Sequence, residues 1–112
     1  MKARQTQPAW QRFELQADVL QGLAHPIRLA IADLLRDGEV CVCDIAAAVG
    51  AERSNVSRHL AVMARSGIVG TRKEGLKVFY RLRTPCVLDF MACATRTIEH
   101  DLAERTRALA DG

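Results

Sequence analysis

The amino-acid pattern predicts a mainly α-helical fold with one small β-hairpin. Over most of the 112-residue chain, apolar residues recur every three or four positions, as they do on one face of a helix. The period changes only near residues 68–83, where two short β-prone runs flank the turn signal Glu74-Gly75. A chain of this length and ordinary composition, 49% hydrophobic and 26% charged, is about one domain, so we expect a single domain over residues 1–112.

Two helices are predicted in the N-terminal third of the chain. Residues 1–16 form an arm and the start of the first helix, whose apolar face holds Trp10, Phe13, Ala17, Leu20 and Ala24. The second helix has His25 as its cap and Pro26 in its first turn, and Gly38 is a good terminator. Its apolar stripe consists of Ile27, Ile31, Leu34 and Leu35.

Residues 44–66 have the pattern of a helix-turn-helix. A short helix, "DIAAAVG", has Asp44 as its expected N-cap and Gly50 as its end. The helix that follows buries one apolar face, made of Val56, Leu60 and Met63 or Ala64. The basic hairpin at 68–83 comes directly after it and forms a wing. The predicted fold is therefore a winged helix-turn-helix, in which the second helix of the motif enters the major groove of DNA.

A long helix over residues 85–109 ends the predicted fold. Thr84 is its expected cap and Pro85 its first helical residue. One face carries Val87, Met91, Ala94, Ile98 and Leu102. A chain this short buries only a modest core, so we expect this helix to supply the interface of a dimer.

The distribution of charge points to a polyanionic partner. Eight basic residues and one acidic residue lie between Arg53 and Arg83, whereas the rest of the chain holds eight basic and twelve acidic residues. A basic segment in an otherwise acidic chain favours nucleic acid. Side chains that can contact base edges or phosphates lie early on the second helix of the motif and on the wing. They are Arg53, Ser54, Asn55, Ser57, Arg58, His59, Arg72, Lys73 and Lys77.

Other classes of protein are disfavoured by what the sequence lacks. No apolar run approaches the ~18 residues of a membrane helix, and the N-terminus has no apolar core like that of a signal peptide. We therefore expect a cytoplasmic protein with no membrane partner. No nucleophile-base-acid set and no phosphate-binding loop is present, so we do not expect an enzyme. In a reducing compartment, four cysteines favour metal binding or redox chemistry over structural disulfides.

The motifs "LAHPIRLAIADLL", "GEVCVCDIAAAVG", "NVSRHLAVMARSGIV" and "RKEGLKVFYRL" resemble the ArsR/SmtB family of bacterial metal- and metalloid-responsive repressors. The resemblance runs from about Val19 to Leu82. It implies a winged-helix homodimer with its first and last helices at the interface. It also implies binding to double-stranded operator DNA and repression of a resistance or efflux operon until an inducer binds. Glu52 stands where many members have a serine cap, which affects the operator sequence expected.

Within this resemblance, Cys41 and Cys43 match the cysteines that bind arsenite or antimonite, so the expected inducer is As(III) or Sb(III). Related repressors use the same region for Cd(II), Pb(II) or Zn(II), which stay open as alternatives. The third cysteine of one arsenite-binding subgroup is replaced by Ala46. A third thiolate therefore has to come from elsewhere in the dimer. A zinc site on the last helix is disfavoured, because Met91 replaces the histidine it needs two residues after Asp89.

Geometry restricts how the four cysteines can combine. Residues i and i+2 of a helix point about 200° apart, so Cys41 and Cys43 can share an ion only if Cys41 precedes the helix or its first turn is distorted. Cys86 and Cys93 are about 10 Å apart along one helix. The most economical site is Cys41 and Cys43 with one of Cys86 or Cys93. The alternatives are that the latter two are small hydrophobes, or that a disulfide or polysulfide bridge to Cys93 senses thiol redox state.

Overall fold

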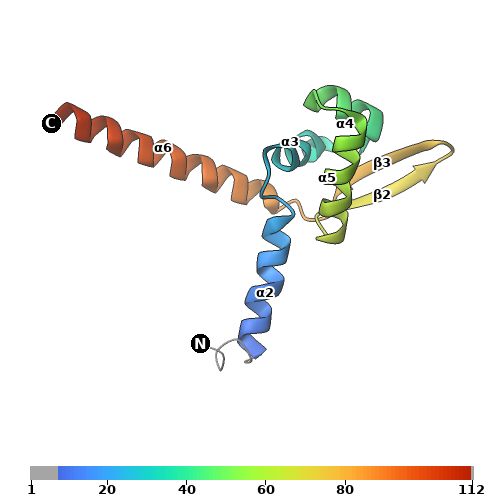
Figure 1. The fold of residues 1–112 in the computed structure, drawn as a ribbon, viewed down its shortest axis with the longest axis horizontal. Coiled ribbons are helices and arrows are strands. Elements are labelled where there is room, and N and C mark those ends of the chain that lie inside the picture. The colour runs from blue at the N-terminus through green and yellow to red at the C-terminus, as the bar shows by residue number, and fades with distance from the viewer. Residues whose placement is uncertain (1–7, 112) are drawn as a thin grey trace.

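The structure, a computed structural model, describes residues 8–111; residues 1–7 of the predicted arm and Gly112 lie outside the described residues. It confirms a mainly helical winged helix-turn-helix with a small antiparallel sheet (Figure 1). The elements in chain order are α2 (Pro8–Gln21), α3 (Pro26–Leu34), a 3-10 turn (Leu35–Asp37), β1 (Val40–Cys41), α4 (Val42–Val49), α5 (Arg53–Arg65), β2 (Val69–Glu74), β3 (Lys77–Leu82) and α6 (Val87–Asp111).

The hydrophobic core lies between α3, α4, α5 and the base of the wing. Its largest fully buried side chains are Ile31, Leu35, Ile45, Val56, Leu60, Met63, Ile68 and Val69. Full burial of side chains of this size contributes about 1.5–3 kcal/mol each. Val56, Leu60 and Met63 belong to this set, so α5 buries the predicted face. Met63 faces inward, whereas Ala64 is exposed.

The start of α3 follows the local sequence signals. His25 is extended, and its Nδ1 accepts a hydrogen bond from the backbone N–H of Ile27 at 3.1 Å. This bond satisfies one of the free N–H groups of the first turn, as a cap does. Pro26 occupies the position in which its missing N–H costs nothing. The predicted cap is therefore confirmed, and it fixes where the chain turns from α2 into α3.

A third strand, β1, joins the two predicted strands of the wing. The sheet order is β1-β3-β2, and both pairings are antiparallel. Val40 pairs with Tyr80 and Cys41 with Phe79, while β2 pairs with the other edge of β3 from Val69↔Leu82 to Glu74↔Lys77. The central strand of the wing is therefore bonded to the segment that leads into α4.

Two predicted helix starts are wrong. We expected Asp44 to cap α4, but α4 begins at Val42, directly after Cys41. Asp44 instead lies in the first turn, where its negative charge interacts favourably with the helix dipole. Pairing with β3 keeps Cys41 extended, which sets the earlier start. We expected Pro85 to be the first residue of the last helix, but α6 begins at Val87. Residues 84–86 form turns instead, in which the Val87 N–H donates to the Thr84 C=O at 3.0 Å.

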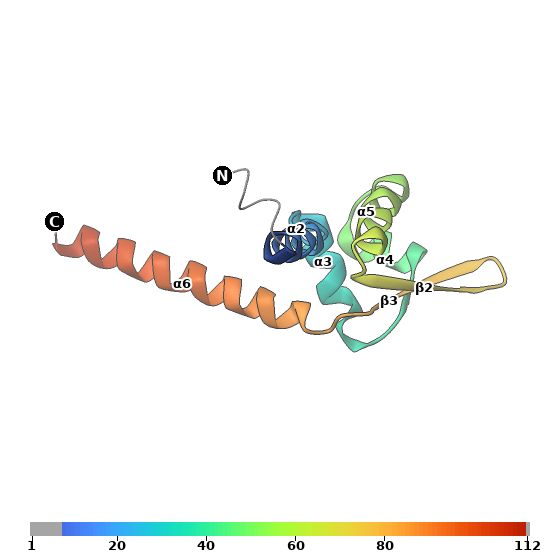
Figure 2. The ribbon, with the colours of Figure 1, turned by 90° about the horizontal axis from the view of Figure 1, so that it is seen from below.

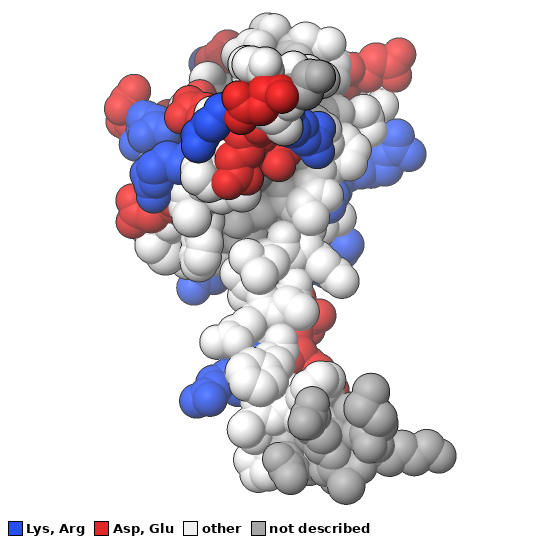
Figure 3. Space-filling view, turned by 90° about the vertical axis from the view of Figure 1, so that its left-hand side faces the viewer, with Lys and Arg blue, Asp and Glu red and all other residues white. Residues whose placement is uncertain are grey.

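Helices α2 and α6 project from the three-helix body, and α6 points away from the wing (Figures 1 and 2). Both carry large exposed apolar side chains: Phe13, Leu15, Val19, Leu20, Phe90, Ile98, Leu102 and Leu109. Few Lys, Arg, Asp or Glu side chains lie along α2 on the face seen in Figure 3. In one chain these predicted dimer faces are therefore uncovered. No helix among the described residues is long and apolar enough to span a membrane.

Replacing Gly22 by Ala is expected to destabilise the fold. Gly22 lies where α2 ends against the body, and an added Cβ would lie 2.6 Å from Ile68 Cδ1 and Ser66 Cβ. Because these atoms belong to the packed junction of α5 and β2, the overlap should lower the free energy of unfolding by about 1–3 kcal/mol, measured by urea denaturation. Gly70→Ala is the matched control, since its Cβ would meet only the flexible end of Arg81. An equal loss in both variants would contradict this account.

Candidate nucleic-acid interface and thiol site

The predicted base-contacting residues lie on the first two turns of α5. Arg53, Ser54, Ser57 and Arg58 are exposed, whereas Asn55 is half-buried and accepts a hydrogen bond from Arg58 Nη2 at 3.4 Å. Glu52 precedes the helix without a side-chain capping bond. The free N–H groups of the first turn and the arginines therefore present a positive end to solvent. This end can bind a phosphate and place polar side chains at base edges.

His59 lies in a different environment from the other candidates on α5. Its Nδ1 accepts from Arg28 Nη1 at 3.1 Å, and its ring lies 4.2 Å from the ring of His25. Burial, with the charges of His25, Arg28 and Arg58, lowers the pKa of His59. The neutral imidazole is therefore favoured, and one edge of it is committed to Arg28.

Arg28 connects α5 to the end of α2. While Nη1 donates to His59, Nη2 donates to the backbone C=O of Gln21 at 2.9 Å and more weakly to that of Ala24 at 3.5 Å. Gln21 is the last residue of α2, where a cation is favoured by the helix dipole, and Ala24 lies in the turn that follows. This role of Arg28 could not be predicted from the sequence, because its partners lie 7 and 31 residues away and leave no periodic signal.

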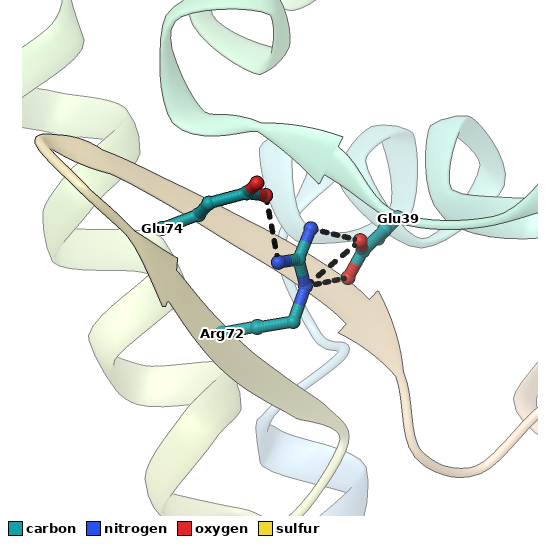
Figure 4. Close-up of polar contacts among 3 residues, drawn as sticks. All are labelled: Glu39, Arg72 and Glu74. Carbon is teal, nitrogen blue, oxygen red and sulfur yellow. Dashed lines mark hydrogen bonds and ion pairs between the residues drawn. The ribbon is translucent and has the colours of Figure 1, made fainter.

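On the wing, the three predicted phosphate-binding residues differ in their surroundings. Lys73 and Lys77 are exposed. Arg72 is bound by two carboxylates (Figure 4): Glu39 accepts from Nη2 at 2.6 Å and from Nε at 3.0 Å, and Glu74 accepts from Nη1 at 2.8 Å. The hydrogen bond from Arg72 lowers the pKa of Glu39. Sequence analysis did not identify Glu39, because nothing in its neighbourhood predicts a partner 33 residues away.

The four cysteines are all free thiols. Cys41 is half-buried in an extended conformation directly before α4, whereas Cys43 is exposed in the first turn of that helix. The geometry that makes residues i and i+2 of a helix point apart therefore does not exclude a shared ion for this pair. Cys86 precedes α6 and Cys93 lies on it, and with Asp89 and Phe90 they line one surface hollow.

No third ligand accompanies Cys41 and Cys43 within residues 8–111. No group of three His, Cys, Asp or Glu side chains in that range is arranged to hold a metal ion. The structure therefore offers two adjacent thiols at the start of α4 and two more around the start of α6, without joining them into one site.

Acidification is expected to destabilise the protein through His59. Since burial and cationic neighbours lower its folded pKa below the ordinary value of 6.5, the unfolded chain binds a proton first as the pH falls. The free energy of unfolding should therefore fall as the pH drops below about 6.5, whereas in His59→Asn this loss should be smaller. Urea denaturation of both proteins at about pH 7.5 and 5.5 measures the difference. An identical pH dependence would show that His59 does not titrate in this way.

Residues 25–71 match the bacterial regulatory proteins of the arsR family. The uncharacterized HTH-type transcriptional regulator Rv0081 of Mycobacterium tuberculosis (strain H37Rv) is 32% identical over 100 residues, 88% of each chain. The arsenical resistance operon repressor of Escherichia coli (strain K12) is 42% identical over 71 residues, 62% of this chain and 61% of that protein.

Among solved structures, the homodimeric winged helix-turn-helix DNA-binding domain Mb0332 from Mycobacterium bovis is similar, with a TM-score of 0.74 and 30% identity. The match covers 89% of this chain and 93% of that one. The family is one of regulatory proteins and Mb0332 is a DNA-binding domain, in agreement with the expectation of a DNA-binding regulator rather than an enzyme. The chain therefore belongs to the arsR family of bacterial transcriptional regulators.

Proposed function

We propose that the protein is a homodimeric repressor of a metalloid-resistance operon that leaves its operator when As(III) or Sb(III) binds its cysteine thiolates. The observation that carries the proposal is the pair of free thiols at the start of α4, one before the helix and one in its first turn. The similarity to the arsenical resistance operon repressor of E. coli supports the same inducer class.

Operator DNA is contacted by α5 and the wing. Arg53, Ser54, Asn55, Ser57 and Arg58 are placed to contact bases and phosphates, and Lys73 and Lys77 to contact the backbone. His59 keeps only its Nε2 edge for a phosphate, because Arg28 occupies the other. Arg72 binds a phosphate only if its ion pairs with Glu39 and Glu74 break.

The homodimer forms through α2 and α6. Phe13, Leu20, Ile98 and Leu102 are about half to two thirds exposed in one chain, and a second copy would bury them. Exposed apolar area on this scale marks an interface rather than ordinary surface. The homodimeric state of Mb0332 supports this arrangement. Two recognition helices then lie on one face, as a near-palindromic operator requires.

Soft thiolates select soft ions, and three of them suit pyramidal As(III) or Sb(III). Condensation of As(OH)₃ with three thiols forms three As–S bonds and releases three water molecules. Cys41 and Cys43 supply two of these thiols, and Cys86 or Cys93 of either protomer supplies the third. Since the start of α4 and the dimer helix α6 then share one ligand, the recognition helices are held in a geometry that fits the operator less well.

Replacing Cys41 and Cys43 together by Ser should abolish induction and leave operator binding intact. In the wild type, arsenite should weaken operator binding about a hundredfold, which corresponds to a coupling free energy of about 3 kcal/mol. Anisotropy of labelled operator DNA, with reduced protein under anaerobic conditions, measures both quantities. Loss of DNA binding in the arsenite-free variant would contradict the separation of the two sites. Cys86→Ser and Cys93→Ser then identify the third ligand.

The same titration separates the alternative inducers. Release by Cd(II), Pb(II) or Zn(II) but not by arsenite would keep the thiol site and change the ion. Release by polysulfide alone would assign the protein to thiol redox sensing, with a bridge from Cys41 or Cys43 to Cys93. That alternative is favoured by one observation, the exposure of Cys43 and Cys93 as free thiols.

Neutralising the two exposed wing lysines should weaken operator binding more than neutralising Arg72. When the logarithm of the operator-binding constant is plotted against the logarithm of the salt concentration, each lost phosphate contact reduces the magnitude of the slope by about 1. Lys73→Gln and Lys77→Gln should each show this change, whereas Arg72→Gln should show less, because two carboxylates already neutralise Arg72. Anisotropy across a range of salt concentrations measures the slopes. A larger change for Arg72→Gln would mean that Arg72 exchanges its carboxylates for phosphate in the complex.

A further inference from the structure

The sheet places Cys41 in one row with two residues of the wing. Cys41 pairs with Phe79 on β3, and Phe79 pairs with Arg72 on β2. Directly opposed residues of neighbouring strands lie on the same face of a sheet. The Arg72 guanidinium agrees with this placement, since its central carbon lies 4.8 Å from the centre of the Phe79 ring. The row therefore runs without interruption from a proposed thiol ligand to the basic wing.

Glu39 forms an ion pair with Arg72, the last residue of this row. It lies two residues before Cys41, and its carboxylate crosses the central strand to bind Arg72 at 2.6, 3.0 and 3.2 Å (Figure 4). This ion pair joins β2 to the residue directly before β1. Since β1 has only two residues, the ion pair adds a second connection, beside the pairing of β1 with β3, between the segment before α4 and the wing. Glu74, by contrast, binds the same guanidinium from within β2.

We propose that the Glu39–Arg72 ion pair transmits inducer binding at Cys41 and Cys43 to the wing. The inference rests on the proposed function and names how that site is coupled to DNA. Drawing the two sulfurs onto one As(III) turns Cys41 out of its row beside Phe79 and shifts the short β1 strand. Glu39 moves with that strand and loses Arg72. The wing then loses one of its connections to the helical body, although its base stays packed in the core, so its outer part has to be ordered again when DNA binds, and operator affinity falls.

Both side chains of the ion pair are partly exposed, 46% for Arg72 and 34% for Glu39. An ion pair of this kind is weaker than a buried one, although its bidentate geometry makes it specific. A contact of modest strength and fixed geometry suits a link that has to open when the inducer binds.

Glu39→Gln and Glu74→Gln form a matched pair for the test. Each removes one carboxylate from the same guanidinium, but only the first cuts the link to the Cys41 segment. Operator anisotropy gives the ratio of Kd with and without arsenite for each variant, so changes in basal affinity cancel. We expect the ratio to fall by about three- to fivefold in Glu39→Gln, as the loss of a partly exposed ion pair allows, and to stay near the wild-type value in Glu74→Gln. Equal ratios in the two variants, with arsenite bound, would overturn the inference.

Hydrogen exchange of residues 69–82 provides a readout that needs neither arsenite nor DNA. Without arsenite, the amides of the wing should exchange several-fold faster in Glu39→Gln than in Glu74→Gln, because only the former removes the ion pair between β2 and the segment before α4. Equal exchange would overturn the inference. If wild-type protein binds no arsenite, as judged by titration of its free thiols, the proposed function fails and the coupling fails with it. The exchange comparison then still decides whether the ion pair holds the wing.

Discussion

The central position of β3 in the sheet organises the DNA-binding half of the molecule. One edge of β3 is bonded to β2, which completes the wing, and the other edge to β1, which leads directly into α4. The wing is therefore not an independent hairpin beside a helix-turn-helix. Its position is set by the same two residues, Val40 and Cys41, that set the start of α4. A change in the backbone at that point alters both elements at once, and this is where the unusual Cys-x-Cys spacing lies.

The two parts of the proposed DNA-binding surface, α5 and the wing, are joined to the rest of the chain through different arginines. Arg28 connects the middle of α5 to the end of α2 through His59 and the carbonyl of Gln21. Arg72 connects the wing to the segment before α4 through Glu39. The orientation of the recognition helix therefore follows the proposed dimer helix, whereas that of the wing follows the proposed thiol site. A ligand at the start of α4 would act directly on the second of these connections.

The features that could be predicted from the sequence are those with a local or periodic cause. The spacing of Val56, Leu60 and Met63 predicts the buried face of α5, and His25 before Pro26 predicts a helix start. Strand β1 could not be predicted, because two residues give no periodic pattern. The start of α4 was misplaced for the same reason, since pairing of Cys41 with Phe79 overrides the capping preference of Asp44. Glu39 has a role only through a partner distant in sequence.

Net charge alone overstates the contribution of the basic segment to DNA binding. Arg72 is one of the eight basic residues between Arg53 and Arg83, yet two carboxylates bind it, and one of them comes from outside that segment. The bidentate bonds from Glu39 compete directly with any phosphate, because an Arg guanidinium offers the same donors to both. The strength of the wing as a phosphate-binding element is therefore set partly by a residue next to the cysteine pair. If the inducer moves Glu39, Arg72 keeps Glu74 as a partner but regains part of its charge, while the wing loses its connection to the segment before α4. Operator release then requires the loss of order to outweigh the gain in charge.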